Sequence, residues 1–464
     1  MKINNNISAI ITNKQLLRTE SGLAASMERL SSGLRINHAS DDPSGLAISN
    51  KMRAQIDGLN QASRNSSDGM SVLETADGAM NEITSVIQRM RELCVQAANE
   101  TNSQSDKEAI QVEIANIRSE IDRISDTTEF NTKSLLDGSL NNRVYTKGAS
   151  RINVSETVAG GNYKLNVLSA AKQAELSAPL NLSSLGDPVT AANAGSISFN
   201  GSKAEIREGM SQEEVRETIR EAAEIGEMEV EFDGSGNAVI RSTAYGDNAK
   251  IEISYDNIAM GTSLGLSGSP TIAYGTDAVV DIFSEDSLFK DSHPSATVRY
   301  EGNKITVTDT KDFEISMLLD KDTTGVISMD VTDIGPMALQ VGANEGQQMV
   351  VKIPSMSVDN LYLDSLDVTT VTGADRGIAA CDEALAMVSK VRASLGAYTN
   401  RLDYTVLSLD ETSENMTSAL SRISDVDMAE EMTEYTKNNV LEQAGTSALA
   451  QANELPQMAL QLLG

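Results

Sequence analysis

The sequence predicts an α+β fold: long helices from the N- and C-terminal regions form an α-helical coiled-coil core, and the middle of the chain is a β-rich domain. Three observations lead to this prediction. Apolar residues recur every three or four positions between Ile378 and Ile423, and similar stripes run through residues 1–140. Beyond about residue 140, the stripes give way to a period of two, interrupted by Asn-Gly and Asp-Gly turns.

The C-terminal stripe is the most regular pattern in the chain. Its spacing keeps one seam on one side of a helix, as in a coiled coil. A helix of this length, at about 1.5 Å per residue, is a rod of roughly 69 Å, and so narrow a seam must pack against other helices. The stripe comprises Ile378, Cys381, Leu385, Val388, Arg392, Leu395, Thr399, Leu402, Val406, Leu409, Ser413, Met416, Leu420 and Ile423.

Residues 1–34 carry the first helical stripe, which begins with Ile3, Ile7 and Ile10. The sequence Ser40-Asp41-Asp42-Pro43 predicts the start of a second helix, because a capping side chain precedes a proline at an early helical position.

The second helix has its most regular stretch between Met80 and Ala97, and a polar turn follows at Asn99 to Ser105. We expect Asp106 to cap a third helix. Its stripe consists of Ile110, Ile114, Ile117, Ile121 and Ile124.

The middle of the chain predicts hairpins with one helix between them. Asn200-Gly201 marks a tight primed turn between alternating strands. Ser211 and Glu214 form a capping box for a helix that ends near Ala223. A second hairpin spans Val230 to Ser242. Further strands are expected at Lys250–Ser254, Thr297–Tyr300, Lys304–Thr308, Phe313–Leu318 and Gln348–Ile353.

Helix resumes near Asp375 and continues to the end of the chain, with one break near Ser424-Asp425. The last segment restores the stripe through Leu441, Leu455, Met458 and Leu462, so we expect the two striped ends to pack together. Their charges agree: residues 1–60 hold seven Lys/Arg and five Asp/Glu, whereas residues 405–464 hold two and ten. Opposite charge favours their association.

Composition excludes several classes of partner. A formal net charge of -30 argues against nucleic acid and against anionic membrane surfaces. No stretch approaches the roughly 20 apolar residues of a membrane span, and the N-terminus lacks the apolar run of a secretory signal. Composition alone therefore indicates a cytosolic protein. Cys94 and Cys381 both fall on stripes, which predicts buried apolar residues rather than metal ligands or a redox pair.

No catalytic, cofactor-binding or metal site is predicted, so we expect a protein that is not an enzyme. The two histidines, His38 and His293, are isolated from other ligand residues, and the sequence contains no HExxH, GxSxG or phosphate-binding GxxxxGK motif. Asp233-Gly-Ser-Gly-Asn237 resembles the start of a calcium loop, but Ala238 occupies the position that requires glycine. We interpret this stretch as a hairpin turn.

Several blocks of sequence, in the same order along the chain, resemble the bacterial flagellins, the subunits of the flagellar filament. They cover residues 1–140 and 373–464, about half of the chain. The blocks are Leu30-Ser-Ser-Gly-Leu-Arg-Ile-Asn37, Gln61-Ala-Ser-Arg-Asn65, Gln88-Arg-Met-Arg-Glu-Leu93, Val95-Gln-Ala-Ala-Asn99, Gln443-Ala-Gly-Thr-Ser447, Leu449-Ala-Gln-Ala-Asn453 and Pro456-Gln457.

The resemblance implies a self-assembling filament with three parts. Residues 1–42 and 424–464 would form an inner helical tube. Residues 43–170 and 338–423 would form a helical core domain with a small β part, and residues 171–337 a variable outer domain that faces solvent. Assembly would depend on the terminal stripes, through Ile3, Ile7, Ile10, Leu441, Leu455, Met458 and Leu462.

The resemblance also implies export, unfolded, through the flagellar type III apparatus without a cleaved signal, and therefore a secreted protein of the bacterial flagellum. Its expected partners are other copies of the chain, a flagellar export chaperone that binds about residues 424–464, the filament cap and the hook-associated proteins.

The block from Gln88 to Leu93 resembles the family's site for the host Toll-like receptor that detects flagellin. Arg89, Leu93 and Glu113 match the recognition positions. Because Met90 and Cys94 are on the stripe, we expect Arg89 and Leu93 to lie beside it, partly open to a partner. The alternative is that these residues serve only subunit packing.

Three other functions compete with a filament subunit. A hook–filament junction protein shares the helical ends. A flagellin with an enzymatic middle region would carry a motif such as HExxH, which is missing. A secreted coiled-coil adhesin would lack the paired terminal blocks.

Overall fold

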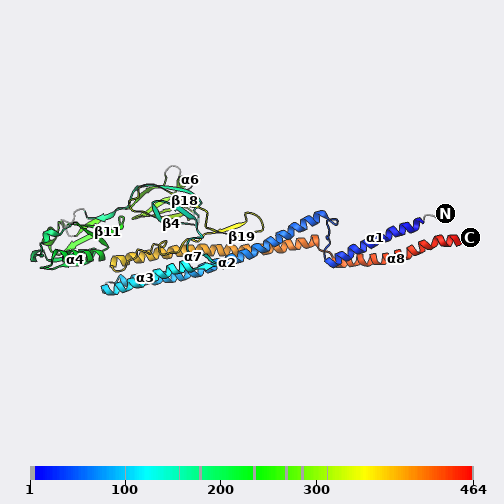
Figure 1. The fold of residues 1–464 in the computed structure, drawn as a ribbon, viewed down its shortest axis with the longest axis horizontal. Coiled ribbons are helices and arrows are strands. Elements are labelled where there is room, and N and C mark those ends of the chain that lie inside the picture. The colour runs from blue at the N-terminus through cyan, green and yellow to red at the C-terminus, as the bar shows by residue number, and fades with distance from the viewer. Residues whose placement is uncertain are drawn as a thin grey trace. The chain divides into compact units, whose positions relative to one another are not determined.

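The computed structural model describes residues 6–99, 101–155, 157–176, 180–233, 237–266, 270–283, 287–310 and 312–461 (Figure 1). The chain divides into two compact units. Unit 1 contains Met1–Met70, Leu339–Met349 and Arg401–Gly464, and unit 2 contains Ser71–Ala338 and Val350–Asn400. The helices α2 (Pro43–Ala97) and α7 (Val371–Ser424) contribute residues to both. The predicted α+β class is confirmed, since helices supply both ends of the chain and strands its middle.

In unit 1, α1 (Ile7–Ser32) lies beside α8 (Met428–Gln461), as Figure 1 shows. The α1 helix begins where the Asn6 side chain accepts the N–H of Ala9, and it ends at Gly33, whose φ of 71° is left-handed. A hydrogen bond at the start of α1 also links it to α8, because the Asn6 side-chain Nδ2 donates to the Ala452 carbonyl at 2.8 Å. The predicted pairing of the two chain ends is therefore confirmed.

The start of α2 follows the sequence prediction. The Asp42 carboxylate accepts the N–H groups of Ser44 at 3.1 Å and Gly45 at 2.9 Å, ahead of the first turn. The helix break predicted near Ser424-Asp425 separates α7 from α8. At this break, Leu34 pairs with Asp425 as an isolated β-bridge.

In unit 2, α3 (Gln104–Thr127) lies with parts of α2 and α7 (Figure 1). Asp77 pairs with Arg392 at 2.8 Å and Arg91 with Asp382 at 2.6 Å, so α2 and α7 run antiparallel. Every second position of the predicted α7 seam is fully buried in this unit, namely Cys381, Val388 and Leu395.

One predicted cap is wrong. Ser103, not Asp106, is the N-cap of α3: the Ser103 side chain accepts the N–H of Asp106, and the Asp106 carboxylate accepts the N–H of Ser103 at 2.9 Å. Ser103 and Asp106 are the two partners of a capping box, and Ser103 is the residue with the extended backbone that the N-cap position requires.

The β-rich part of unit 2 has two separate cores. The first lies between two four-stranded antiparallel sheets, ordered β14-β5-β18-β3 and β15-β16-β17-β4, and includes Tyr163, Phe289 and Phe313. The strands are β3 (Arg143–Thr146), β4 (Ala149–Val154), β5 (Gly161–Ser169), β14 (Val279–Asp281), β15 (Thr297–Glu301), β16 (Lys304–Thr308), β17 (Glu314–Leu319) and β18 (Gly325–Thr332), with α6 (Leu288–Ser292) beside them.

The second core includes Phe199, Ile240 and Ile253 and is closed by α4 (Gln212–Ile225), whose predicted capping box is confirmed. One sheet is ordered β10-β11-β6 with β7 also on β11, and the other β13-β12-β8-β9. The strands are β6 (Gln173–Glu175), β7 (Leu180–Asn181), β8 (Gly195–Phe199), β9 (Ser202–Ile206), β10 (Met228–Phe232), β11 (Asn237–Tyr245), β12 (Lys250–Tyr255) and β13 (Thr271–Tyr274); α5 (Ile258–Ser263) and the 3₁₀ turns η1 (Leu182–Leu185) and η2 (Ala191–Asn193) complete it.

The turn chemistry read from the sequence is confirmed. Asn200 and Gly201 have φ values of 46° and 94°, as a primed turn between β8 and β9 requires. The β10–β11 hairpin flanks Asp233-Asn237, of which residues 234–236 lie outside the described part of the chain. Two short hairpins remain: β1 (Glu129–Phe130) with β2 (Lys133–Ser134), and β19 (Met337–Gln340) with β20 (Gln348–Val351).

Three ion pairs hold the β-rich part against α7. Arg376, Glu383 and Lys390 lie seven residues apart, hence on one face of the helix, and alternate in sign. They pair with Glu227 at 2.5 Å, Lys304 at 2.6 Å and Glu314 at 2.7 Å, respectively. We call this series the α7 charge ladder.

Candidate assembly and recognition surfaces

The face of α1 that meets α8 carries small polar residues together with Leu16, Leu23 and Leu30, which are partly buried. In α1, all of which the structure describes, the buried residues are Thr19 and Ser26. Space between the helices is tight at both glycines: a Cβ on Gly22 would meet the side chain of Asn438 at 3.3 Å, and one on Gly445 would meet Leu16 at 3.3 Å. The leucines of this contact are therefore only partly buried.

Many other large apolar side chains of the same helices point outward. Ile10 is 62% exposed, and its neighbours along both helices are exposed to a similar degree. We call this set the terminal apolar face: Ile7, Ile10, Ile11, Leu17 and Met27 on α1, and Met428, Met432, Val440, Leu441, Leu455 and Met458 on α8. An exposed apolar surface of this extent typically marks a protein–protein interface.

Five of the seven residues predicted to mediate assembly belong to the terminal apolar face: Ile7, Ile10, Leu441, Leu455 and Met458. Ile3 and Leu462 lie outside the described residues. These five residues therefore do not form the seam between α1 and α8, where Thr19 and Ser26 are buried and Leu16 is partly buried.

Charge contributes one ion pair between these helices in the described residues. Arg29 Nη1 lies 3.7 Å from Glu431 Oε2, and the Glu431 side chain is nearly buried. Of the other charged residues at the two ends, Glu28 pairs with His38 and Glu434 with Lys437, each within its own end, whereas Arg18 and Glu430 lie at the surface. The opposite charge of the two ends is thus mostly unused within the chain.

The predicted recognition residues lie where α2 and α3 meet. Arg89 Nη2 donates to Glu113 Oε1 at 2.9 Å, and Arg89 Nη1 lies 3.3 Å from Glu92 Oε2. The hydrogen bond that Arg89 donates to Glu113, reinforced by the one to Glu92, raises the pKa of Arg89 above its ordinary value, so the guanidinium stays charged. Both Arg89 and Glu113 are exposed and adjacent, as a contact patch would need.

The expectation that Leu93 is partly open to a partner is wrong. Leu93 is only 1% exposed. A single stripe would leave position 93 beside the seam, but α2 has neighbours on two sides in this unit: Arg89 reaches Glu113 on α3, while Arg91 reaches Asp382 on α7. A buried Leu93 can support Arg89 from beneath but cannot touch a partner.

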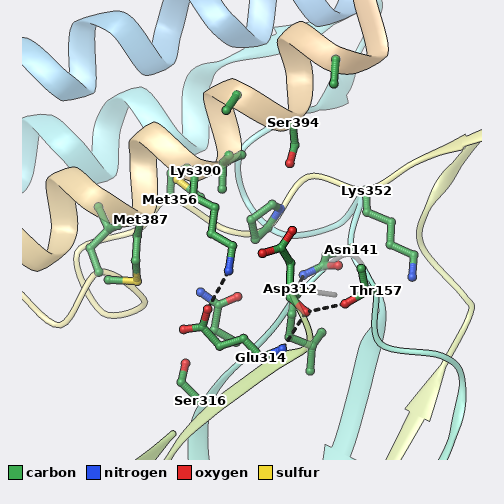
Figure 2. A pocket seen from close by; sticks show the side chains of 18 residues that line it. Asn141, Thr157, Asp312, Glu314, Ser316, Lys352, Met356, Met387, Lys390 and Ser394 are labelled. Atoms are coloured by element: carbon green, nitrogen blue, oxygen red, sulfur yellow. Dashed lines mark hydrogen bonds and ion pairs between the residues drawn. The ribbon is translucent and has the colours of Figure 1, made fainter. Parts of the chain in front are cut away.

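A cavity of about 510 Å³, which the sequence did not predict, lies among α7, strands β4 and β17, and residues 352–361 (Figure 2). Figure 2 shows Lys390 reaching toward Glu314, and these two groups are 2.7 Å apart. Met356 and Met387 provide apolar walls. Two acidic residues, Asp312 and Glu314, and two lysines, Lys352 and Lys390, line the cavity, and the described lining contains neither histidine nor cysteine.

The described residues contain no group of three or more His, Cys, Asp or Glu that could hold a metal ion. In the same part of the chain, no helix is both long enough and apolar enough to span a membrane.

The seven-residue spacing of Arg376, Glu383 and Lys390 was visible in the sequence, but their partners in the β-rich part were not.

Comparison with known proteins gives matches at both ends of the chain. Residues 3–141 match the bacterial flagellin N-terminal helical region, and residues 378–463 match the bacterial flagellin C-terminal helical region.

Similarity also extends along the whole length. A flagellin of Clostridium tyrobutyricum is 36% identical over 98% of this chain and 100% of the relative. Flagellin B of Vibrio anguillarum is 31% identical, with both chains fully covered. A flagellin of Salmonella rubislaw is 32% identical over 99% of each chain.

Proposed function

Because the chain belongs to the bacterial flagellin family, the structural subunits of the flagellar filament, we propose that its copies polymerise through the terminal apolar face. As a flagellin it is a non-enzymatic protein of the bacterial flagellum, located outside the cell. The observation that carries the choice of surface is the outward orientation of large apolar side chains on α1 and α8, at positions where the chain itself provides no cover.

The residues we assign to assembly are Ile3, Ile7, Ile10, Leu441, Leu455, Met458 and Leu462. Burial of apolar side chains supplies the driving force for such association, at about 25 cal/mol per Å² of apolar surface removed from water. The charges of the two ends, basic on the N-terminal side and acidic on the C-terminal side, would orient one copy on the next.

For the filament we propose the same division of the chain as the resemblance implies. Residues 1–42 and 424–464 form the inner part, residues 43–170 and 338–423 the helical core part, and residues 171–337 the outer part. The separate apolar core within residues 174–266 supports an outer position for that segment, since it folds around its own centre.

Seeded polymerisation tests the proposed surface. Purified chain is added to fragmented filaments and examined by electron microscopy, beside a variant that carries Ile10→Gln and Leu441→Gln. The variant should leave the seeds at their original length. A matched control, Val326→Gln, changes an equally exposed apolar residue on β18 and should elongate the seeds normally. Normal elongation by the double variant would contradict the proposal.

We further propose that the chain is exported unfolded through the flagellar type III apparatus, where a flagellar export chaperone covers about residues 424–464. The exposed Met428 and Met432 on α8 support this, because an isolated apolar helix face needs cover before assembly. The filament cap and the hook-associated proteins are the proposed partners at the ends of the filament. Binding of chaperone to the chain, and its loss on removal of residues 424–464, tests this proposal.

Recognition by the host flagellin-sensing Toll-like receptor is the remaining proposal, with Arg89 and Glu113 as contact residues and Leu93 as the buried support of Arg89. The exposed, ion-paired geometry of Arg89 and Glu113 supports it. A hook–filament junction role is not favoured, since the relatives matched along their whole length are named flagellins.

A further inference from the structure

The two cysteines of the chain meet inside the helix pair formed by α2 and α7 in unit 2. Both Cys94 and Cys381 are free thiols and both are fully buried. Next to them, Arg91 Nε donates to Asp382 Oδ1 at 2.6 Å, which fixes the register of the two helices at this level. A Cβ on Gly377, one turn before Cys381, would lie 3.0 Å from Cys94 Sγ, so this sulfur rests against the backbone of α7.

The two thiols also interact with each other. Their mutual hydrogen bond lowers the pKa of Cys94. The same hydrogen bond, now with Cys94 as the neighbour, raises the pKa of Cys381, and burial raises it further. The described residues offer no third ligand with which the pair could hold a metal ion. The pair is therefore two sulfurs in contact, carried by two antiparallel helices.

We propose that Cys94 and Cys381 are an oxidative modification site, and that they form an intramolecular disulfide that joins α2 to α7 once the protein is outside the cell. Extracellular proteins persist in an oxidising environment, in which disulfides form and are retained, whereas the bacterial cytosol keeps thiols reduced. The sequence interpretation of both residues as inert apolar side chains is the competing view.

The oxidant is a low-molecular-weight disulfide. The Cys94 thiolate attacks one sulfur of the oxidant, forming a mixed disulfide and releasing one thiolate. The Cys381 thiolate then attacks Cys94 Sγ, which forms the Cys94–Cys381 bond and expels the second thiolate. The two cysteines lose two electrons to the oxidant, and their two protons end on the two released thiols.

Burial determines when this reaction occurs. Because both sulfurs are sealed from solvent in the folded state, the oxidant reaches them while the contact between α2 and α7 is open, during folding or transient opening. Once formed, the bond is buried and protected from reductants. It would close a loop that contains α3 and the β-rich part, and thereby restrict the unfolded chain.

Peptide mapping by mass spectrometry tests the proposal directly. The full chain is unfolded, refolded in a mixture of reduced and oxidised glutathione, alkylated with N-ethylmaleimide and digested. We expect an unalkylated peptide pair joined through Cys94 and Cys381, and an intact mass lower by two hydrogen atoms. A chain that is reduced while unfolded and then refolded without oxidant should have a thermal midpoint lower by roughly 5–10 °C, the order expected for loss of a stabilising disulfide. Filaments alkylated directly on isolation should give the same joined peptides.

Two single variants, Cys94→Ala and Cys381→Ala, serve as controls. In each variant the remaining cysteine should carry either N-ethylmaleimide or glutathione, and the thermal midpoint should not respond to reductant. The proposal is overturned if the wild-type chain, folded in the presence of oxidised glutathione, yields both cysteines alkylated or carrying separate adducts. That result would identify the pair as packing residues only.

Discussion

Replacing Leu455 by alanine separates assembly from folding. Leu455 is 55% exposed on α8, so its truncation removes little packing from the isolated chain, and exposed substitutions of this kind usually change stability by under about 0.5 kcal/mol. Full burial of a leucine side chain is worth about 1.5–3 kcal/mol. If a neighbouring copy covers the exposed 55%, the variant loses roughly 0.8–1.7 kcal/mol per subunit on assembly.

Since about 1.4 kcal/mol corresponds to a factor of ten, the critical concentration for polymerisation should rise roughly 4- to 18-fold. The assay is the concentration of chain left in the supernatant after seeded filaments are sedimented at equilibrium, measured beside a melting curve of the monomer. Leu168→Ala is a matched control, because Leu168 is 61% exposed but lies on β5. Equal critical concentrations for the two variants, or a lower melting point for Leu455→Ala with unchanged assembly, would refute the reasoning.

Three further predictions follow from the contacts described. Arg89→Ala should weaken activation of the flagellin-sensing receptor in reporter cells without changing the melting point. Leu93→Ala should instead destabilise the fold by about 2–5 kcal/mol, because Leu93 is buried. A large shift in the melting point of Arg89→Ala would contradict the first expectation. A chain in which Gly-Gly replaces residues 173–275 should still elongate seeded filaments, because the residues that flank this segment, Lys172 and Thr276, already lie side by side in an antiparallel bridge. Loss of polymerisation by a folded deletion protein would contradict this expectation. Lys390→Glu should lower the free energy of unfolding by under about 1 kcal/mol, and the additional change Glu314→Lys should restore it, as measured in a double-mutant cycle. A double variant less stable than either single variant would argue against a direct pairing.

Local signals in the sequence predicted the structure well. Asn200-Gly201 specified its own hairpin because the residues that need positive φ are adjacent to the strands that they join. Asp42 capped α2 for the same reason, since donor and acceptor lie within three residues. The α7 seam was recoverable because its period is a property of one helix.

Pairings between distant segments were not predictable in this way. Strand β5 lies against β18, where Asn162 Nδ2 donates to Ser328 Oγ, 166 positions further along the chain. No turn residue records such a partnership, and the sequence analysis identified neither strand. The charge ladder has the same origin: the period of its α7 residues is visible, but Lys304 and Glu314 come from strands whose distance from the helix only the fold sets.

The candidate surfaces show a related limit. Periodicity identified which residues of α1 share a face, but it could not say whether Ile7 and Ile10 face α8 or solvent. The deciding signal was the small residues at Thr19, Gly22 and Ser26, which permit close approach on the other side. Leu93 was misplaced because a second neighbouring helix on α2 was not considered.

The incomplete burial of apolar side chains between α1 and α8 has a thermodynamic consequence. A helix pair that buries Thr19 and Ser26 while exposing Ile10 and Leu17 gains little free energy from its own closure. Its order is then linked to mass action: the concentration of free subunits, rather than the sequence of one chain, sets the temperature at which these helices melt. Depolymerisation and loss of terminal helix should therefore be one transition, whose midpoint rises with the logarithm of the total protein concentration, while the cores of unit 2 melt at a temperature that does not depend on concentration.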